Sequence, residues 1–260
     1  MKRCPSAPTT SLTRTYQIIL GLLLTIPALA VAPAGAADPG PHPLPVDLET
    51  ELALSALPEH LRADATVYRL DTSRGFVVLR EGTNGFHAFV ARNDPGIYQA
   101  DWEHTKWDDL LIPIAFDAAG VASHMQPYFD LARDRAAGVG PLDAQNRLRE
   151  RYTSTYQAPE RAGISFMLAP VMRAYRGAFR TNEIATFSSP HYMYYAPFVT
   201  PSEVGSAPSL EHPVMLSLEP GPHGLIVWLK GKSESEAIRG QYASLLKALC
   251  AHDHDLCLEG

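Results

Sequence analysis

The order of β-favouring and helix-favouring segments is the feature that most constrains how this chain can fold. Three runs rich in β-branched and aromatic residues are separated only by short turn sequences: residues 65–71 (ATVYRLD), 75–81 (GFVVLRE) and 86–92 (FHAFVAR). Segments with helical spacing of apolar residues lie before and after such runs, without the regular strand–helix alternation of a doubly wound fold. The pattern predicts an α+β fold: a single domain with a mainly antiparallel sheet and helices packed on it.

Several local structures are expected within this domain. The sequence GTNG, residues 82–85, predicts a hairpin turn in which Asn84 and Gly85 take positive φ. Residues 93–109 are polar with scattered aromatics and are expected to be a surface loop. Residues 110–117 (LLIPIAFD) are expected to be a buried strand, which Pro113 places at an edge or a bulge. Helices are predicted at residues 47–57, 127–137 and 142–156. A last helix is predicted to start at Ser233, where Glu236 completes a capping box. Strands are predicted at residues 163–175, with a break at Pro170, and as an antiparallel pair at residues 214–220 and 223–230.

The N-terminus has the pattern of a secretory signal peptide. Three basic residues accompany the start of an apolar stretch, and the small residues AGA at 34–36 form a cleavage site. We interpret residues 1–36 as a signal peptide, the proline-rich residues 37–46 as a tether and residues 47–260 as the folded domain. An uncleaved anchor is the alternative, although the apolar stretch is short and contains two prolines. The protein is therefore expected to be exported, periplasmic or extracellular, with no stable membrane span after cleavage.

The charge of the chain disfavours two classes of partner. The whole sequence has 22 basic and 28 acidic residues, and the first 36 residues contain three basic and no acidic ones, so the remainder carries a net charge of −9. Nucleic acids and anionic membranes both require cationic surface. The sequence therefore predicts no nucleic-acid partner, and a small-molecule ligand is the partner we expect.

Cys250 and Cys257, in the sequence LCAHDHDLC, are the two cysteines that remain after signal cleavage. Two cysteines so close together in an exported chain are expected to form a disulfide. A metal site that also uses His252 and His254 is an alternative, since thiolate and imidazole are both zinc ligands, but the spacing matches no common zinc motif. An unstructured, solvated tail is the third possibility.

The turn at residues 82–86 (GTNGF), together with Pro113 and Asp117, resembles a broad group of exported bacterial proteins with no assigned function. Members of that group have a Gly-(Ser/Thr)-Asn-Gly-aromatic turn with a nearby cysteine, and a second cysteine in a Pro-x-Cys-x-Asp stretch. The two cysteine positions are Ala88 and Ala115 in this chain. If the family's cysteines form a disulfide, the resemblance implies that this protein lacks it and that hydrophobic packing holds those strands together.

Residues 190–198, PHYMYYAPF, are the densest aromatic stretch in the sequence. As a strand, this segment puts His191, Met193 and Tyr195 on one face and its other two tyrosines on the opposite face. Tyrosine and histidine have apolar bodies and polar tips, so the segment suits either a core strand or the wall of a pocket. A basic residue nearby would anchor an anionic ligand. The candidate ligand-binding residues are His191, Tyr192, Tyr194 and Arg173.

No motif of catalytic or cofactor chemistry stands out. The sequence lacks Gly-x-Ser-x-Gly, His-Glu-x-x-His and phosphate-loop patterns, and Ser244 and Lys247 match Ser-x-x-Lys without its partner motifs. No cofactor and no metal are therefore expected. Histidines near strand ends and a carboxylate could still form an acid–base cluster, and the weak candidates are His191, His223, His124 and Asp117. The sequence thus predicts an exported protein that binds a small molecule in an aromatic and histidine-lined pocket, with a hydrolase as the alternative.

Overall fold

The structure is a computed structural model that describes residues 44–96, 98, 103–175, 183–205, 214–217 and 220–258. The predicted signal peptide lies outside the described residues. Leu44 is buried, so the packed structure includes the last residues of the segment expected as a tether. Within the described residues, no helix has both the length and the apolar character needed to cross a membrane. The helices are α1 (Val46–Ser55), α2 (Glu59–Arg62), α3 (Ala118–Ala122), α4 (Gln126–Ala136), α5 (Pro141–Ser154), α6 (Pro201–Val204), α7 (Lys232–Gln241) and α8 (Ala243–His252), followed by the short 3₁₀-helix η2 (His254–Leu256).

The described strands form one large sheet and one small sheet. The large sheet has eight strands in the order β2-β1-β3-β4-β5-β8-β10-β9, and the small one pairs β6 with β7. All neighbouring strands are antiparallel except β1 and β3, which are parallel. The predicted α+β fold with a mainly antiparallel sheet is confirmed. The strands are β1 (Thr66–Asp71), β2 (Gly75–Arg80), β3 (His87–Ala91), β4 (Ile112–Phe116), β5 (Ile164–Met167), β6 (Met172–Tyr175), β7 (Ile184–Phe187), β8 (His191–Tyr195), β9 (Val214–Ser217) and β10 (Leu225–Leu229).

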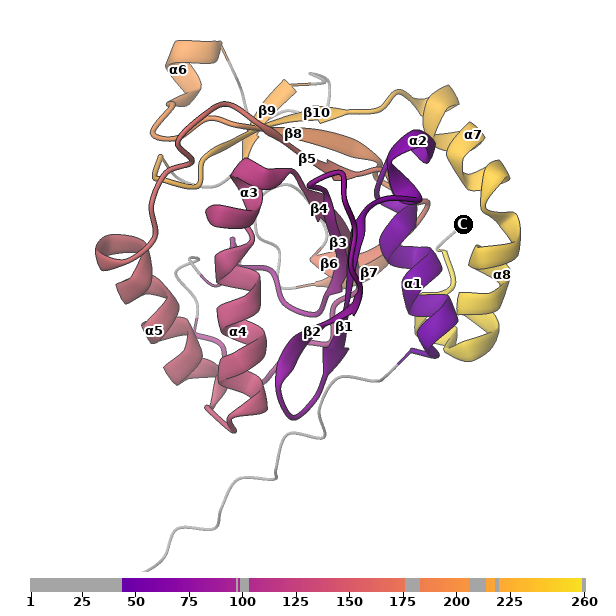
Figure 1. Cartoon of the computed structure of the whole chain (residues 1–260), viewed down its shortest axis with the longest axis horizontal. Coiled ribbons are helices and arrows are strands. Elements are labelled where there is room, and N and C mark those ends of the chain that lie inside the picture. Colours follow the sequence, from indigo (N-terminus) through magenta and orange to yellow (C-terminus); the bar gives the residue numbers. More distant parts are fainter. Residues whose placement is uncertain are drawn as a thin grey trace, which may run out of the picture. The chain divides into compact units, whose positions relative to one another are not determined.

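Helices cover both faces of the large sheet (Figure 1). On one face α1 and α8 bury leucines such as Leu52 and Leu249 against Val67 and Val90 of the sheet. On the other face α4 packs its aromatic side chains against Phe89, beside α3 and α5. Burying one large apolar side chain contributes about 1.5–3 kcal/mol, so these two layers supply most of the drive to fold.

The helices of the second layer form where the sequence predicts them. Pro127 lies in the first turn of α4, where its missing N–H breaks no hydrogen bond. Gly138 follows the helix with φ of 75°, a left-handed conformation that glycine adopts without strain. The last helix differs from the prediction, because it begins at Lys232 and is divided at Tyr242 into α7 and α8. The capping carboxylate is Glu234, which accepts from the Gly231 N–H at 3.1 Å, rather than the expected Glu236.

The predicted hairpin at GTNG is wrong. β2 and β3 are not neighbours, because β1 lies between them, and residues 82–85 carry the chain across the end of β1. The backbone N–H of Thr83 donates to the Asp64 carbonyl, and the Asn84 side chain donates to the Leu61 carbonyl, so the turn is bonded to the entrance of β1. Gly85 has φ of 76° as expected, whereas Asn84 does not have positive φ. The turn sequence is therefore used for a crossover, not for a hairpin.

Pro113 lies inside the large sheet, so the expectation of an edge or a bulge is wrong. The Leu111 N–H donates to the Arg173 carbonyl of β6, and the same side of β4 pairs with β5 only at Ala115 and Phe116. Because alternate residues of a strand direct their N–H groups to the same side, the nitrogen of Pro113 falls in the gap between these two pairings. Its missing N–H therefore costs the sheet no hydrogen bond.

Most described residues in the range 93–109 are buried or half-buried, which corrects the predicted surface loop. Tyr98 has no exposed surface and stacks on His104, with ring centres 4.1 Å apart. Gln145 of α5 donates to the Tyr98 carbonyl and accepts from the His104 N–H. The polar character of this segment is satisfied by internal hydrogen bonds, which its sequence alone does not reveal.

Ala88 and Ala115, the positions that carry cysteines in the resembled family, lie directly opposite each other on β3 and β4. Both have no exposed surface and belong to the core beneath α1. Directly opposed residues in an antiparallel pair have Cα atoms about 4.5–5.5 Å apart, within the range that a disulfide spans. In this protein β3 and β4 are joined by their antiparallel backbone pairing and by the packing of small apolar side chains at these two positions.

Candidate functional site

The aromatic segment forms β8, with the alternation that its sequence predicts. His191, Met193 and Tyr195 are buried on the face toward α3 and α4. Tyr192 is half-buried and Tyr194 is 43% exposed on the opposite face. His191 therefore does not line one pocket together with the two tyrosines.

His191 is a core residue in this arrangement. Its Nδ1 lies 2.6 Å from the carbonyl oxygen of Ser189, so this nitrogen is the protonated one. Burial lowers the pKa of His191, and the hydrogen bond to Ser189 opposes this shift. The ring is therefore held neutral and serves packing.

His124 and His223, two of the weak catalytic candidates, do come together. Their rings stack with centres 4.8 Å apart, and His124 also stacks on Tyr195 at 4.2 Å. Across a strand spacing of about 3.3 Å per residue, His191 lies roughly 13 Å along β8 from Tyr195. The predicted cluster of three histidines thus contains two of them, with Tyr195 in place of His191.

Asp117, the carboxylate of this group, is occupied by structural bonds. Its Oδ1 accepts from Tyr195 Oη at 3.1 Å and from the Gly120 N–H at 2.9 Å, which caps α3. Its Oδ2 accepts from the Ile164 N–H at 3.2 Å. The carboxylate thus ties β4, α3, β5 and β8 together.

Two glycines allow this close packing. A Cβ atom on Gly163 would lie 2.7 Å from the Tyr195 ring, and one on Gly120 would collide with the Tyr195 hydroxyl. The four side chains of Asp117, His124, Tyr195 and His223, which we call the tyrosine–histidine cluster, are only 3–9% exposed. A solute has no exposed surface of consequence to reach here, so the arrangement suits a structural role.

Burial controls protonation in the tyrosine–histidine cluster. Desolvation, with a contribution from neighbouring His223, lowers the pKa of His124 to about 3. Desolvation likewise lowers the pKa of His223 to about 4, against a hydrogen bond from its Nε2 to the Gln157 carbonyl. Both rings are therefore neutral near pH 7. Among the described residues, His223 Nδ1 makes no hydrogen bond.

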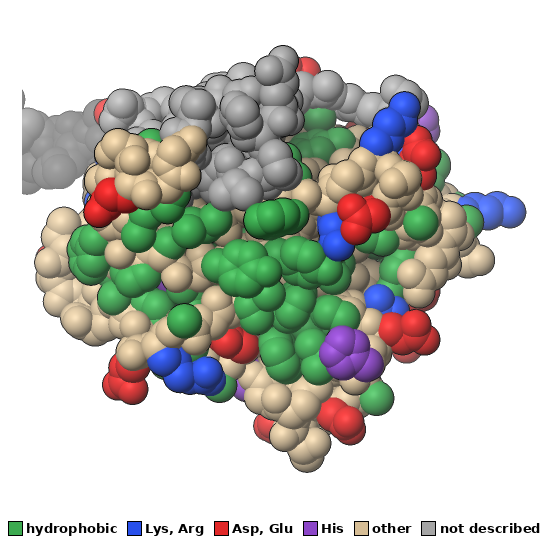
Figure 2. Space-filling view, turned by 90° about the horizontal axis from the view of Figure 1, so that it is seen from above, with side chains coloured by type: hydrophobic (Ala, Val, Ile, Leu, Met, Phe, Trp, Pro, Cys, Tyr) green, Lys and Arg blue, Asp and Glu red, His purple; other side chains and the backbone are tan. Residues whose placement is uncertain are grey.

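Tyr192 and Tyr194 belong to an aromatic surface on the other face of β8. Tyr192 lies opposite Trp228 of β10, and the Lys230 ammonium lies 4.7 Å from the Tyr192 ring centre. Trp228 is 48% exposed, and the positive-φ residue Phe198 is exposed nearby in sequence. Figure 2, seen from the side of β8, β10 and α6, shows hydrophobic side chains gathered on this part of the surface.

The fourth ligand candidate, Arg173, lies elsewhere, in an open pocket of about 260 Å³. The pocket is formed where the small sheet meets the segment before β4 and the end of α8. Its lining is mixed in charge, with three Arg or Lys side chains, four Asp side chains and one His. The lining residues are Leu44, Arg92, Lys106, Trp107, Asp108, Asp109, Leu111, Arg173, Ile184, His252, Asp253, Asp255 and Leu256.

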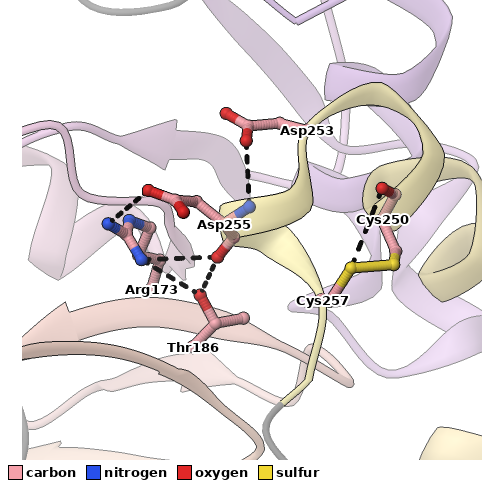
Figure 3. Close-up of a disulfide and its surroundings, with 6 residues drawn as sticks. All are labelled: Arg173, Thr186, Cys250, Asp253, Asp255 and Cys257. Carbon is pink, nitrogen blue, oxygen red and sulfur yellow. Dashed lines mark hydrogen bonds and ion pairs between the residues drawn. A yellow bond between two sulfur atoms is a disulfide. The ribbon is translucent and has the colours of Figure 1, made fainter.

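Arg173 is held firmly at its backbone and offers its guanidinium to the pocket. Its backbone N–H and carbonyl both bond to Leu111 at 2.8 Å, which fixes β6 to the start of β4. Arg173 Nη2 donates to Asp255 Oδ2 at 3.0 Å, and Nη1 donates to the Asp255 carbonyl at 3.3 Å (Figure 3). Thr186, directly opposite on β7, donates its hydroxyl to the same carbonyl at 2.5 Å. The guanidinium thus already donates to one carboxylate oxygen and to the carbonyl oxygen of Asp255.

The Arg173–Asp255 pair is accessible to solvent. The Asp255 side chain is 67% exposed and that of Arg173 is 23% exposed. Exposed ion pairs contribute about 0.2–1 kcal/mol. A solute carboxylate could therefore displace this one at small cost.

Arg92 is the buried cation of the pocket. It follows β3, is 5% exposed, and its Nη1 donates to Asp109 Oδ1 at 3.3 Å. Burial lowers its pKa, while Asp109 and the buried Glu49 of α1 oppose this shift. The pocket therefore has one buried guanidinium, that of Arg92, and one partly exposed guanidinium, that of Arg173, whose contact with Asp255 a ligand can displace.

Cys250 and Cys257 form the predicted disulfide, with Cα atoms 4.4 Å apart. The disulfide closes a ring of chain that includes Asp253 and Asp255 (Figure 3). Asp253 accepts from the Asp255 N–H at 2.9 Å and starts η2, while Leu256 is buried in the core. In the described part of the chain, no group of three or more His, Cys, Asp or Glu side chains is placed to hold a metal ion.

Sequence reasoning found Arg173 but missed its surroundings. Arg92 ends a β-rich run and looks like an ordinary strand-end arginine, and nothing marks Thr186 as a partner. The one available signal was the disulfide prediction, because a closed ring at residues 250–257 fixes Asp255 relative to α8. Which strand this ring meets depends on contacts distant in sequence.

Comparisons of the chain with known protein families, with curated proteins and with solved structures found no match. The resemblance to the exported bacterial group therefore stays a prediction.

Proposed function

We propose that this is an exported protein that binds a small polar molecule carrying a carboxylate, with Arg173 as the anchor. The observation that carries the proposal is the geometry of Arg173. Its guanidinium lines a pocket and donates to two oxygens of Asp255, a contact that a ligand can displace. Planar guanidinium groups bind carboxylates through two parallel N–H donors. A free carboxylate can take the place of the Asp255 oxygens.

The mixed charge of the pocket suggests the rest of the ligand. Asp108 and Asp109 line the same space as the guanidinium groups, so an amino group on the ligand has acceptors within the pocket. A volume of about 260 Å³ is small beside the roughly 300–1,000 Å³ of sites for drug-sized molecules. A small zwitterion, such as an amino acid or a dipeptide, fits these properties best.

Export is supported by two features. The N-terminal sequence has a signal-peptide pattern, and the Cys250–Cys257 disulfide is typical of oxidising compartments.

A screen of small compounds tests the proposed function. Amino acids and dipeptides, the matched amines without a carboxylate, and neutral sugars are compared by thermal shift and by ligand-observed NMR. The proposal predicts that compounds with a carboxylate bind and that the matched amines do not. Equal binding of amines and sugars would contradict it.

A hydrolase is the second candidate, favoured by the stacking of His124 on His223 and on Tyr195, whose hydroxyl donates to Asp117. It requires that a substrate reach side chains that are 3–9% exposed. The discriminating observation is esterase or peptidase activity that His223→Gln abolishes without loss of folding. A ligand could also stack on the aromatic surface formed by Tyr194 and Trp228, so substitutions there serve as a control for binding at Arg173.

A further inference from the structure

We propose that Asp255 is a built-in competitor for the Arg173 pocket, and that the Cys250–Cys257 disulfide keeps it there. This inference rests on the proposed function, since it concerns the regulation of the same site. Reducing the disulfide would release the competitor and raise the affinity for carboxylates. The pocket would thus respond to the redox state of its surroundings.

First, Asp255 occupies the hydrogen-bond donors of Arg173 that a ligand carboxylate needs. Arg173 Nη2 bonds to the Asp255 carboxylate at 3.0 Å, and Nη1 and the Thr186 hydroxyl both bond to the Asp255 carbonyl. A ligand carboxylate that binds Arg173 through two oxygens must displace these contacts. Only the fraction of molecules in which Asp255 has moved away is competent, and the apparent Kd rises by the inverse of that fraction.

Second, the disulfide controls the fraction of molecules in which Asp255 contacts Arg173. Asp255 lies inside the ring that Cys250 and Cys257 close, so it cannot move far from the end of α8 while the disulfide is intact. A short closed ring holds its members at a high effective concentration near a neighbouring group. Opening the ring leaves the segment attached through α8, the core contacts of Leu256 and Leu258, and the bonds to Arg173 and Thr186, but removes the covalent closure.

The third step is that the disulfide is accessible. Cys250 and Cys257 are both half-buried rather than enclosed, at the end of an exposed helix turn. A dithiol can attack one sulfur and form a mixed disulfide, and its second thiol then displaces the other cysteine. The products are two cysteine thiols and the oxidised, cyclic dithiol, so electrons and protons balance.

The test uses the full mature chain and the tightest-binding amino acid or dipeptide of the screen. Its Kd is measured by calorimetry for oxidised and dithiothreitol-reduced protein, in the wild type, in Asp255→Asn and in Asp253→Asn. Asp253→Asn is a matched control, because it removes the same charge from the same pocket and keeps an oxygen that can accept from the Asp255 N–H.

The inference predicts a Kd about 3–10-fold lower for oxidised Asp255→Asn than for the wild type, as expected if Arg173 is free in roughly a tenth to a third of molecules. Asp253→Asn should lower the Kd at most twofold. Reduction should lower the Kd of the wild type at least twofold and that of Asp255→Asn by clearly less, because this variant lacks the carboxylate and keeps only the weaker contact of the residue 255 carbonyl with Arg173.

Two results overturn the inference and leave the proposed function standing: equal Kd values for the oxidised wild type and Asp255→Asn, or a reduction effect of the same size in both. If reduced and oxidised forms of every variant fail to bind any carboxylate, the proposed function itself is wrong. Circular dichroism of each sample, before and after reduction, separates a change in affinity from loss of folding.

Discussion

Tyr195 donates a hydrogen bond from its hydroxyl to Asp117 Oδ1 at 3.1 Å, and so joins the end of β8 to the capped N-terminus of α3. The same hydroxyl lies 3.0 Å from the Ile164 carbonyl. Burial and the nearby Asp117 carboxylate raise the pKa of Tyr195, so the hydroxyl keeps its proton and remains a donor. This bond fixes a residue of the aromatic segment whose sequence also suited a ligand site.

Tyr195→Phe should therefore destabilise the protein. The substitution leaves the buried Asp117 without one of its donors, and an unsatisfied buried polar group costs about 1–3 kcal/mol. Urea denaturation measures the loss. Tyr194→Phe, at a 43% exposed position on the same strand, is the control and should change stability by less than about 0.5 kcal/mol. Equal effects of the two substitutions would contradict the structural role of the Tyr195 hydroxyl.

Acid should destabilise the protein through His124 and His223. Their pKa values are lowered to about 3 and about 4 in the folded state, against 6.5 for an ordinary histidine. The unfolded chain therefore binds protons that the folded chain excludes, so the stability contribution is complete above pH 6.5 and falls as the pH drops toward 4. At pH 5 the loss is about 2 kcal/mol for each histidine.

The pH dependence is measured by urea denaturation between pH 4.5 and 8. His223→Phe fills the same space without a titrating group, and it should flatten the slope by about one proton below pH 6. An unchanged slope in this variant would show that His223 is not held neutral by burial.

Loss of the disulfide should lower stability as well. The double substitution Cys250→Ser and Cys257→Ser opens the short ring, which costs about 2.5 kcal/mol in the chain-entropy relation. Thermal and urea denaturation of the oxidised wild type and the double variant give this difference. Mass spectrometry after alkylation should find neither Cys250 nor Cys257 alkylated in the oxidised wild type. Alkylation of both Cys250 and Cys257 in that sample would refute the disulfide.

Ala88 and Ala115 offer a test of the strand register. Because they are directly opposed on β3 and β4, Ala88→Cys and Ala115→Cys together should form a second disulfide on oxidation. The new ring would stabilise the protein by up to about 3.5 kcal/mol in the chain-entropy relation. Each single substitution is the control and should give no second disulfide. Free thiols in the oxidised double variant would contradict the register of β3 and β4.

The sequence was informative wherever local physics decides the structure. The alternation of β8, the helix that starts near Pro127 and ends before Gly138, and the C-terminal disulfide follow from side-chain pattern, proline geometry and loop closure. The α+β class follows from the grouping of strands and helices.

The errors have a common cause, since in each case a local pattern was satisfied by a partner distant in sequence. GTNG looks like a hairpin turn, but its hydrogen bonds go to Leu61 and Asp64, so it crosses the end of β1. Pro113 is tolerated inside the sheet because the position of its nitrogen coincides with a gap between β5 and β6.

The site was predictable only in part for the same reason. His124 and His223 meet because α3 and the start of β10 approach β8, and Arg173 meets Asp255 because the ring at the end of α8 reaches the small sheet. Spacing in the sequence gives no measure of either approach.

Binding of a carboxylate ligand by Arg173 variants tests the central claim most directly. Calorimetry with the best ligand of the screen compares the wild type, Arg173→Lys, Arg173→Gln and a surface control. The surface control is a double variant that carries both Tyr194→Ala and Trp228→Ala. Circular dichroism and the thiol count verify that each variant is folded and oxidised.

We predict that Arg173→Gln raises the Kd at least tenfold and that Arg173→Lys, which keeps the charge but loses the planar pair of donors, raises it to an intermediate degree. The surface control should change the Kd less than twofold. Binding that survives Arg173→Gln, or that is lost in the surface control instead, would contradict the account.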